Sequence, residues 1–294
     1  TGGKSDTQLF SLAVRPSDHG GDGGDPGNGE ELDIDVEAST ITADWSHTCG
    51  LTTTGAAYCW GRNDWGQLGN GDTNSQLVPT PVAGDLTFAS ITASLSHTCG
   101  LTTTGAAYCW GRNDWGQLGN GDTNSQLVPT PVAGDLTFAS ITASLSHTCG
   151  LTTTGAAYCW GYGGTGQLGN GDINSRLVPT PVAGDLTFAS ITAGNAHTCG
   201  LTTTGAAYCW GDGGDGRLGN GDTNSQLVPT PVAGDLTFAS ITADWDHTCG
   251  LTTTGAAYCW GRNDWGQLGN GDTNSQLVPT PVAGDLTFAS ITAS

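Results

Sequence analysis

Short segments of β-prone residues, separated by turn residues, make up most of the sequence. In the stretch from residue 41 to residue 90, Ile41–Ala43, His47–Thr52 and Ala56–Gly61 each predict a strand. Thr53–Gly55 separates the last two and predicts a three-residue hairpin loop, with Gly55 at the position that favours a positive φ. No segment keeps a helical period over ten residues, so the pattern predicts an all-β protein.

The remainder of this stretch predicts a long loop and an edge strand. Arg62–Ser75 is rich in Gly, Asn and Asp, which is the composition of a loop. Leu77–Val82 contains two prolines, which cannot donate to a strand ladder, so it fits only at the edge of a sheet. Leu86–Phe88 leads into a second Ile-Thr-Ala segment. We therefore expect three to four antiparallel strands in each such stretch.

The stretch is one unit of a repeat with a period of 50 residues and no insertion. The segment HTCGLTTTGAAYCWG begins at five histidines: His47, His97, His147, His197 and His247. Periods of this size are typical of solenoids, propellers and arrays. The complete repeats are 41–90, 91–140, 141–190, 191–240 and 241–290, and Ile-Thr-Ala-Ser at 291–294 begins a sixth. Ile41 already occupies the position that a closing strand would fill, so we expect a truncated piece of a longer array, with closure into five blades as the alternative.

Residues 1–38 stand outside the repeat. They contain nine acidic and two basic residues and the glycine-rich run GGDGGDPGNGEE, so they predict a mostly disordered acidic linker. We expect any signal peptide to have been removed or to lie outside this sequence, because no hydrophobic leader precedes the repeats. The repeat region 39–294 is predicted to form one β-propeller.

Three linked motifs in each unit resemble the regulator of chromosome condensation repeat. They are Ile-Thr-Ala-Gly-x-x-His-Thr at 191–198, Leu-Thr-x-x-Gly-x-x-Tyr-x-Trp-Gly at 51–61 and Gly-x-Asn-x-x-Gly-Gln-Leu-Gly-x-Gly-Asp at 61–72. The resemblance covers residues 39–294. It implies a β-propeller, usually of seven blades, and this chain departs from that number with five complete units. It also implies that His47 and its copies are structural residues rather than catalytic ones.

Each unit contains two cysteines in the predicted hairpin. Counting outward from the three-residue loop places Thr52 opposite Ala56 and, three positions further, Cys49 opposite Cys59 in a non-hydrogen-bonded pair, where Cα atoms lie ~4.5 Å apart. That separation suits a disulfide. The five pairs are Cys49–Cys59, Cys99–Cys109, Cys149–Cys159, Cys199–Cys209 and Cys249–Cys259. Zinc sites and reduced thiols are the alternatives, although a structural zinc site needs about four ligands. Disulfides would place the protein outside the cytosol.

Composition and charge exclude several classes of function. The formal charge of −20, from 7 basic and 27 acidic residues, opposes binding to nucleic acid. No apolar run approaches the ~18 residues of a membrane span, so we expect no membrane insertion. No unique set of nucleophile, base and oxyanion donors occurs, so we expect neither enzymatic activity nor a cofactor. Asn70–Asn74 alternates oxygen-bearing side chains, which suit either a turn or a calcium ion; we favour the turn and predict no metal site.

The five units differ almost only in two places: the three residues before each histidine and the four residues after each Trp-Gly. Single changes occur besides at Ile173, Arg176 and Arg217. Because alternate connections of an antiparallel meander leave from the same end, both variable segments are expected on one face, with the constant hairpins on the other. The candidate ligand-binding residues on the variable face are Trp45, Arg62, Asp64, Trp65, Arg112, Asp114, Trp115, Tyr162, Trp245, Arg262, Asp264 and Trp265.

The residues that differ between the units in these two segments include Trp, Tyr and Arg. Because these types are enriched in interface hot spots, the variation favours recognition of a partner. We expect the variable-loop tryptophans to be exposed and to form one arc if five blades close, or to split if they do not. Trp60 and its copies, at the end of a core strand, are expected to be buried. The leading hypothesis is an extracellular or cell-surface module that binds a protein or a glycan, of undetermined oligomeric state. The alternatives are guanine-nucleotide exchange on a small GTPase, which the resemblance implies, and a structural spacer whose loops vary by drift.

Overall fold

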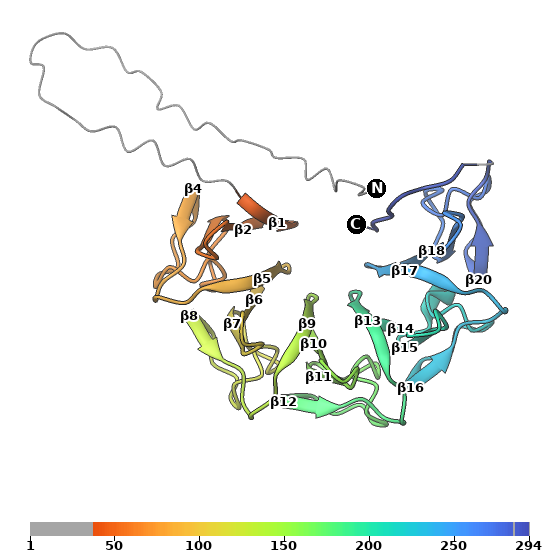
Figure 1. The fold of residues 1–294 in the computed structure, drawn as a ribbon. Helices are drawn as coiled ribbons and strands as arrows, with labels where there is room; N and C mark the ends of the chain where they lie inside the picture. The colour runs from red at the N-terminus through yellow and green to blue at the C-terminus, as the bar shows by residue number, and fades with distance from the viewer. Residues whose placement is uncertain (1–37, 285, 294) are drawn as a thin grey trace, which may run out of the picture.

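Five four-stranded antiparallel sheets are arranged as the blades of a β-propeller (Figure 1). The structure is a computed structural model that describes residues 38–284 and 286–293. It confirms the all-β architecture and the blade of about 50 residues that the repeat predicts. The predicted acidic linker lies outside the described residues, except for Ala38, with which the first strand begins. Among the described residues, no helix is long and apolar enough to cross a membrane.

In every blade the strands follow one another in chain order from the inner to the outer edge. Blade 1 consists of β1 (Ala38–Asp44), β2 (His47–Thr52), β3 (Ala57–Gly61) and β4 (Gln76–Pro81). Blade 2 consists of β5 (Phe88–Ala93), β6 (His97–Thr102), β7 (Ala107–Gly111) and β8 (Gln126–Pro131). Blade 3 consists of β9 (Phe138–Ala143), β10 (His147–Thr152), β11 (Ala157–Gly161) and β12 (Arg176–Pro181).

The last two blades repeat this order. Blade 4 consists of β13 (Phe188–Ala193), β14 (His197–Thr202), β15 (Ala207–Gly211), the short 3-10 helix η1 (Gly214–Gly216) and β16 (Gln226–Pro231). Blade 5 consists of β17 (Phe238–Ala243), β18 (His247–Thr252), β19 (Ala257–Gly261) and β20 (Gln276–Pro281). The strands β1, β5, β9, β13 and β17 lie nearest the centre of the molecule, and β4, β8, β12, β16 and β20 form its outer edge (Figure 1).

The inner strands are longer than the Ile-Thr-Ala segments that predicted them. From blade 2 onward they begin at the phenylalanine three residues earlier, because the backbone N–H of Phe88 donates to the carbonyl of Gly55 in the preceding hairpin at 2.8 Å. The third strand starts one residue later than predicted, since Ala56 closes the hairpin by accepting from the N–H of Thr52 at 2.9 Å.

The register of the central hairpin is the one that the loop length predicts. Cys49 lies opposite Cys59, and Leu51 lies opposite Ala57. All five cysteine pairs form disulfides, with Cα atoms 4.1 Å apart in every blade, and no cysteine among the described residues is free. The zinc and free-thiol alternatives are therefore excluded for these residues.

The hydrophobic core lies between neighbouring blades, since a single sheet cannot cover its own apolar face. Leu51 and Leu68 of blade 1 pack in one buried cluster with Phe88 and Trp110 of blade 2. The Trp110 ring is fully buried, and its Nε1–H donates to the carbonyl of Gln67 in the preceding blade at 3.0 Å. The same bond joins Trp160 and Trp210 to their preceding blades.

The Trp110 ring approaches the loop of the preceding blade so closely that this loop requires a glycine at the point of contact. Gly69 has φ +70°, and a Cβ atom there would lie 2.6 Å from the Nε1 atom of Trp110. The Gly-Gln-Leu-Gly motif therefore supplies a backbone surface flat enough to receive the tryptophan of the next blade.

A histidine and a threonine form a second link between blades. The Nε2 atom of His47 lies 2.8 Å from the Thr98 hydroxyl oxygen, and that hydroxyl donates to the carbonyl of Gln67, also at 2.8 Å. The link recurs at the next three junctions. Burial lowers the pKa of His97, like that of the two histidines that follow it, to about 3, which keeps these rings neutral. The predicted structural role of this histidine is observed, with the threonine of the next blade as its partner.

The five blades form an open arc, without the five-blade closure weighed from the sequence (Figure 1). Leu77 in blade 1 is 95% exposed, whereas its copy Leu127 is 37% exposed, because no loop of another blade in the described part of the chain covers blade 1. Trp60 is only partly buried for the same reason, so the expectation that all five core tryptophans are buried is wrong at this position. At the other end, the N–H of Ala293 donates to the Thr242 hydroxyl at 3.4 Å, a bond that recurs between blades.

The difference between covered and uncovered tryptophans gives a stability prediction. Trp160→Ala should lower the free energy of unfolding by ~3–5 kcal/mol, because it empties a fully buried site between two blades. Trp60→Ala, the same change in the uncovered blade, should cost less than half as much. Urea unfolding followed by tryptophan fluorescence measures both; equal losses would contradict the account of the core.

The disulfides give a prediction in thiol counts. Alkylation of the denatured protein without reductant should modify none of the ten cysteines, and alkylation after reduction should modify all ten. Each disulfide closes a loop of about ten residues and is expected to contribute ~2–3 kcal/mol, so reduction should also lower the melting temperature. Ten reactive thiols before reduction would refute the pairing.

Candidate functional site

The two variable segments of each blade lie at the same end of its sheet. His47 pairs with Gly61, so the loop that precedes β2 and the loop that follows β3 are adjacent. The N–H of Arg62 donates to the carbonyl of Ser46 at 2.8 Å, and every later blade has the corresponding bond. The constant hairpins, such as Thr53–Gly55, join the opposite ends of the same strands. One face of the arc thus holds all the variable loops, and we call it the variable face.

Side chains of neighbouring blades stack on the variable face. The guanidinium of Arg112 lies over the ring of Trp65, 4.9 Å from its centroid, and the rings of Trp115 and Tyr162 lie 4.8 Å apart. The position that carries Trp65 in one blade therefore meets the position that carries Arg112 in the next. These contacts leave the tryptophans partly exposed, at 36% for Trp65 and 45% for Trp115.

Each of the three Arg-Asn-Asp-Trp loops contains an internal ion pair. The Nε atom of Arg62 lies 2.7 Å from a carboxylate oxygen of Asp64, and Arg112 and Arg262 make the same pair with their own aspartates. Exposed pairs of this kind contribute little to stability. Their effect is to hold the guanidinium in place above the loop.

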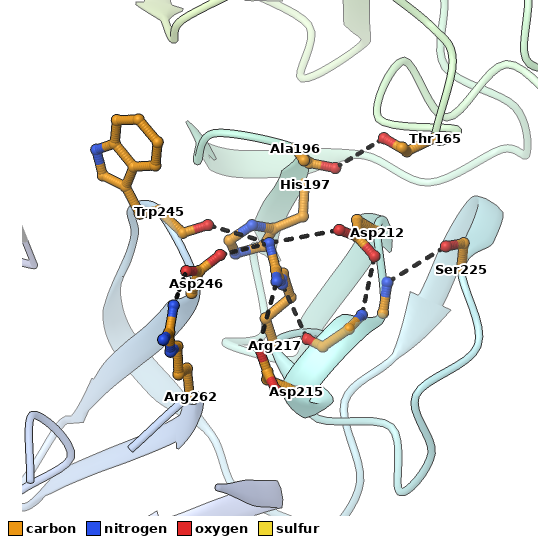
Figure 2. A network of polar contacts seen from close by, with 12 residues as sticks. Thr165, Ala196, His197, Asp212, Asp215, Arg217, Ser225, Trp245, Asp246 and Arg262 are labelled. Atoms are coloured by element: carbon orange, nitrogen blue, oxygen red, sulfur yellow. Dashed lines mark hydrogen bonds and ion pairs between the residues drawn. The ribbon is translucent and has the colours of Figure 1, made fainter. Parts of the chain in front are cut away.

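A buried arginine joins the variable loops of blades 4 and 5 (Figure 2). Arg217 occupies the position of Gln67 and is 6% exposed. Its Nη1 lies 2.9 Å from a carboxylate oxygen of Asp246 and donates to the carbonyl of Trp245 at 3.2 Å. Asp212 and Asp215 lie at 3.5 Å and 3.7 Å from the guanidinium nitrogens.

These four charged residues occur in no other unit, and they contact one another. Asp246 replaces Ser46 and contacts Arg217 across the junction, and it also pairs with Arg262 at 3.2 Å. The variable residues of blades 4 and 5 thus form one network of ion pairs.

The inner variable loops meet at the centre of the arc. They line an open cavity whose walls include Asp44, Trp45, Asn195, Asp244 and Trp245. The rings of Trp45 and Trp245, from the first and the last blade, lie 5.9 Å apart. Burial raises the pKa of Asp244, and the nearby negative charge of Asp44 adds to that effect.

The predicted binding residues fall into three groups rather than one arc. The first is the stacked row of blades 1 to 3, comprising Arg62, Asp64, Trp65, Arg112, Asp114, Trp115 and Tyr162. The second is the central pair, Trp45 and Trp245. The third is the far end of the arc, with Arg262, Asp264 and Trp265. Trp265 is 86% exposed, because no further blade meets it. The other exposed tryptophans are thus divided between the two ends of the arc, as expected for an array that stays open. The exception is at the centre, where Trp45 and Trp245 meet.

Several residues of these groups were not among the predicted ones. Asp44, Asn195 and Asp244 line the central cavity, and Arg217 and Asp246 form the buried ion pair. All five belong to the variable positions, so their variation was the available signal. Residue type did not single them out, since aspartate and asparagine are also common in turns.

The oxygen-rich loop at Asn70–Asn74 forms a turn organised by an amide. The Nδ2 atom of Asn63 donates to the side-chain oxygen of Asn70 at 3.0 Å and to the carbonyls of Asp72 and Asn74. The amide group thus occupies the point toward which these oxygens converge. Across residues 38–284 and 286–293, no group of three or more His, Cys, Asp and Glu side chains could hold a metal ion.

Comparisons with known proteins agree with this architecture. The sequence model of the RCC1-like domain matches residues 6–294. The crystal structure of human WBSCR16 has a TM-score of 0.78 at 21% identity, over 87% of this chain and 69% of that one. Yeast RCC1 (Prp20), bound to Kap60, has a TM-score of 0.76 at 22% identity, over 87% and 66% of the two chains. The chain thus spans about two thirds of the length of these propellers.

A receptor ectodomain shares a somewhat higher identity with the chain. The entire ectodomain of the receptor kinase CR4 from Physcomitrella patens has a TM-score of 0.58 at 25% identity. The match covers 88% of this chain and 56% of the ectodomain.

The buried arginine of blade 4 gives a testable prediction. Arg217→Gln introduces the residue of the other four blades and should lower the free energy of unfolding by ~2–3 kcal/mol, because three carboxylates lose their cation. The added change Asp246→Ser, which introduces the residue of blades 1 to 3, should recover part of that loss. Urea unfolding of the single and double variants measures the coupling.

Arg62→Gln is the matched control for this prediction. Its guanidinium is about half exposed and pairs only with Asp64, so the change should cost less than ~0.5 kcal/mol. Strictly additive effects of the changes at 217 and 246 would show that the two residues are not coupled.

Proposed function

The chain belongs to the RCC1-like domain family, and we propose that it is a non-enzymatic extracellular or cell-surface module that binds a protein through its variable face. One observation carries the proposal. Every exposed tryptophan among the described residues belongs to a variable loop, while the constant hairpins of the opposite face contain none: the exposed ones are Trp45, Trp65, Trp115, Trp245 and Trp265.

The stacked row in blades 1 to 3 has the character of an interface hot spot. Tryptophan, tyrosine and arginine dominate such sites, because they present a large area with few rotatable bonds. The contacts of Trp65 with Arg112 and of Trp115 with Tyr162 hold these side chains in place before a partner arrives. Preorganisation of this kind lowers the entropy that binding would otherwise cost.

The charge of the propeller favours a basic partner. Residues 39–294 contain 18 acidic and 5 basic side chains. A surface of this sign attracts basic proteins and speeds their association, and it repels phosphate backbones. The arginines on the variable face are paired with aspartates, so they present hydrogen-bond donors without an excess of positive charge.

The relatives support a protein partner and an exported location. The yeast Prp20 structures are described by their binding to Kap60, and by binding properties to Gsp1p and histones, so one propeller of this fold binds proteins. The CR4 relative is the ectodomain of a receptor kinase. Five disulfides suit an oxidising compartment, because cytosolic thiols are kept reduced.

Capture from the conditioned medium of the producing cells tests the proposal. Immobilised protein is compared with the triple variant Trp65→Ala, Trp115→Ala and Tyr162→Ala, and quantitative mass spectrometry identifies the retained proteins. We expect the triple variant to weaken binding of a captured protein by about 30-fold or more, since a hot spot contributes ~2 kcal/mol or more.

The triple variant Thr53→Ala, Thr103→Ala and Thr153→Ala, on the exposed tips of the constant hairpins, is the matched control and should bind like the parent. Equal capture by all three proteins would contradict a role for the variable face. Binding to a glycan array without protein capture would favour a glycan ligand. Accelerated release of a fluorescent guanine nucleotide from a small GTPase would favour an exchange factor instead.

A further inference from the structure

The cavity at the centre of the arc differs from the stacked row in its chemistry. All five inner loops contribute to its wall, and the side chains at its rim include the carboxylates of Asp44 and Asp244 and the indole rings of Trp45 and Trp245. Within residues 38–284 and 286–293, no lysine or arginine lines it. The wall is therefore anionic and aromatic.

Two buried histidine nitrogens, each on a strand that follows an inner loop, lack a hydrogen-bond partner. They are the Nδ1 atoms of His47 and His197, whose residues are 2% and 0% exposed. In blades 2 and 3 the same nitrogen lies 2.8 Å or 2.7 Å from the hydroxyl of a serine, Ser94 or Ser144. Blade 1 has Asp44 at that serine position, and blade 4 has Gly194.

The hydrogen bonds of the threonine partners determine whether the unpartnered histidine nitrogens donate or accept. The hydroxyl of Thr248 donates to the carbonyl of Arg217 at 2.9 Å, so it must accept the Nε2–H of His197. The Nδ1 atom of the neutral ring then carries a lone pair and can only accept. The same argument holds for His47, because the Thr98 hydroxyl donates to Gln67. Both nitrogens require a donor.

The unpartnered nitrogen of His197 faces the wall of the cavity. A Cβ atom on Gly194, which lines the cavity, would lie 2.8 Å from it. The neighbouring Arg217 directs its N–H groups to Gly214, to Trp245 and to Asp246, and none reaches the histidine (Figure 2). None of the residues that the structure describes therefore supplies the donor.

The tryptophans indicate what kind of cation fits between the carboxylates. Trp45 is 75% exposed and Trp245 is 41% exposed, although their rings lie 5.9 Å apart. Indole faces attract organic cations, and large exposed aromatic side chains mark interaction sites. A metal ion fits less well, because no three His, Cys, Asp or Glu side chains of the described residues converge.

We propose that the central cavity binds a primary ammonium group, the side chain of a lysine on the basic partner, between Asp44, Asp244 and the two tryptophans. This inference rests on the proposed function for the origin of the lysine. The ammonium group donates three hydrogen bonds in different directions, which suits acceptors distributed around a cavity. A guanidinium prefers planar, two-pronged acceptors. The unpartnered nitrogen of His197 accepts from the ammonium directly or through a water molecule.

A small probe tests the site without any partner protein. Nα-acetyl-lysine N-methylamide is titrated into the full chain, and the indole N–H signals of Trp45 and Trp245 are followed by NMR. We expect saturable shifts that weaken with salt, and binding at least tenfold weaker for the neutral analogue Nα-acetyl-norleucine N-methylamide. Because no partner is present, the result is independent of the capture experiment.

The double variant Asp44→Ser and Asp244→Ser introduces the residue that blades 2 and 3 already have at these positions. There the serine hydroxyl forms a hydrogen bond with the histidine Nδ1 atom. It should fold, as judged by an unchanged circular dichroism spectrum, and bind the lysine probe at least tenfold more weakly. Thr53→Ala on the opposite face should bind the probe like the parent. Equal binding of the two analogues, unchanged binding by the double variant, or displacement of the probe by millimolar Mg²⁺ would each overturn the proposal.

Discussion

At each of the first three junctions, one backbone carbonyl organises the contact between a blade and the next. The carbonyl of Gln67 accepts both the Thr98 hydroxyl and the Trp110 indole N–H, and Thr98 in turn accepts from His47. All of these groups are buried, where an unsatisfied polar atom would be costly. Because the donors and the acceptor belong to different blades, no blade satisfies its polar groups or buries its tryptophan alone. The stability of each blade therefore depends on its contacts with the neighbouring blades.

This junction explains which positions are free to vary. The strands, the cysteines and the Gly-Gln-Leu-Gly loop take part in it and are nearly identical in all units. Most side chains of the variable loops lie outside it and can therefore be exchanged, whereas Ser94 and Ser144 contact the junction histidines. Arg217 is the informative exception, because it replaces a junction glutamine while its backbone carbonyl still accepts from Thr248. The changed side chain lies among three carboxylates, which are likewise unique to blades 4 and 5.

The variable face combines two kinds of surface. The outer row offers aromatic and arginine side chains that are already stacked on one another, as at Trp65 and Arg112. The central cavity offers carboxylates, indole rings and unpartnered acceptor nitrogens such as that of His197. A protein with a basic, lysine-bearing surface is complementary to both, and the acidic charge of the propeller would draw it in.

The sequence by itself determined the blade. The hairpin loop of three residues sets the register, and the register places Cys49 opposite Cys59. The 50-residue period predicts the stacking of identical units, and the variable positions mark one face. These features are local or periodic, so the order of residues along the chain specifies them. The ends of strands are less well specified: Phe88 joins its strand through a bond to Gly55 that the pattern does not reveal.

Only the tertiary structure decided which copies of a residue share an environment. Trp60 and Trp110 have identical sequence contexts, yet one is partly exposed and the other buried, because a neighbouring blade covers only the second. Trp45 and Trp245 lie 200 residues apart and meet because the arc curves back toward its own centre. Contacts of this kind depend on the curvature summed over five blades. A single repeat does not encode that curvature, so reading the sequence unit by unit could not supply it.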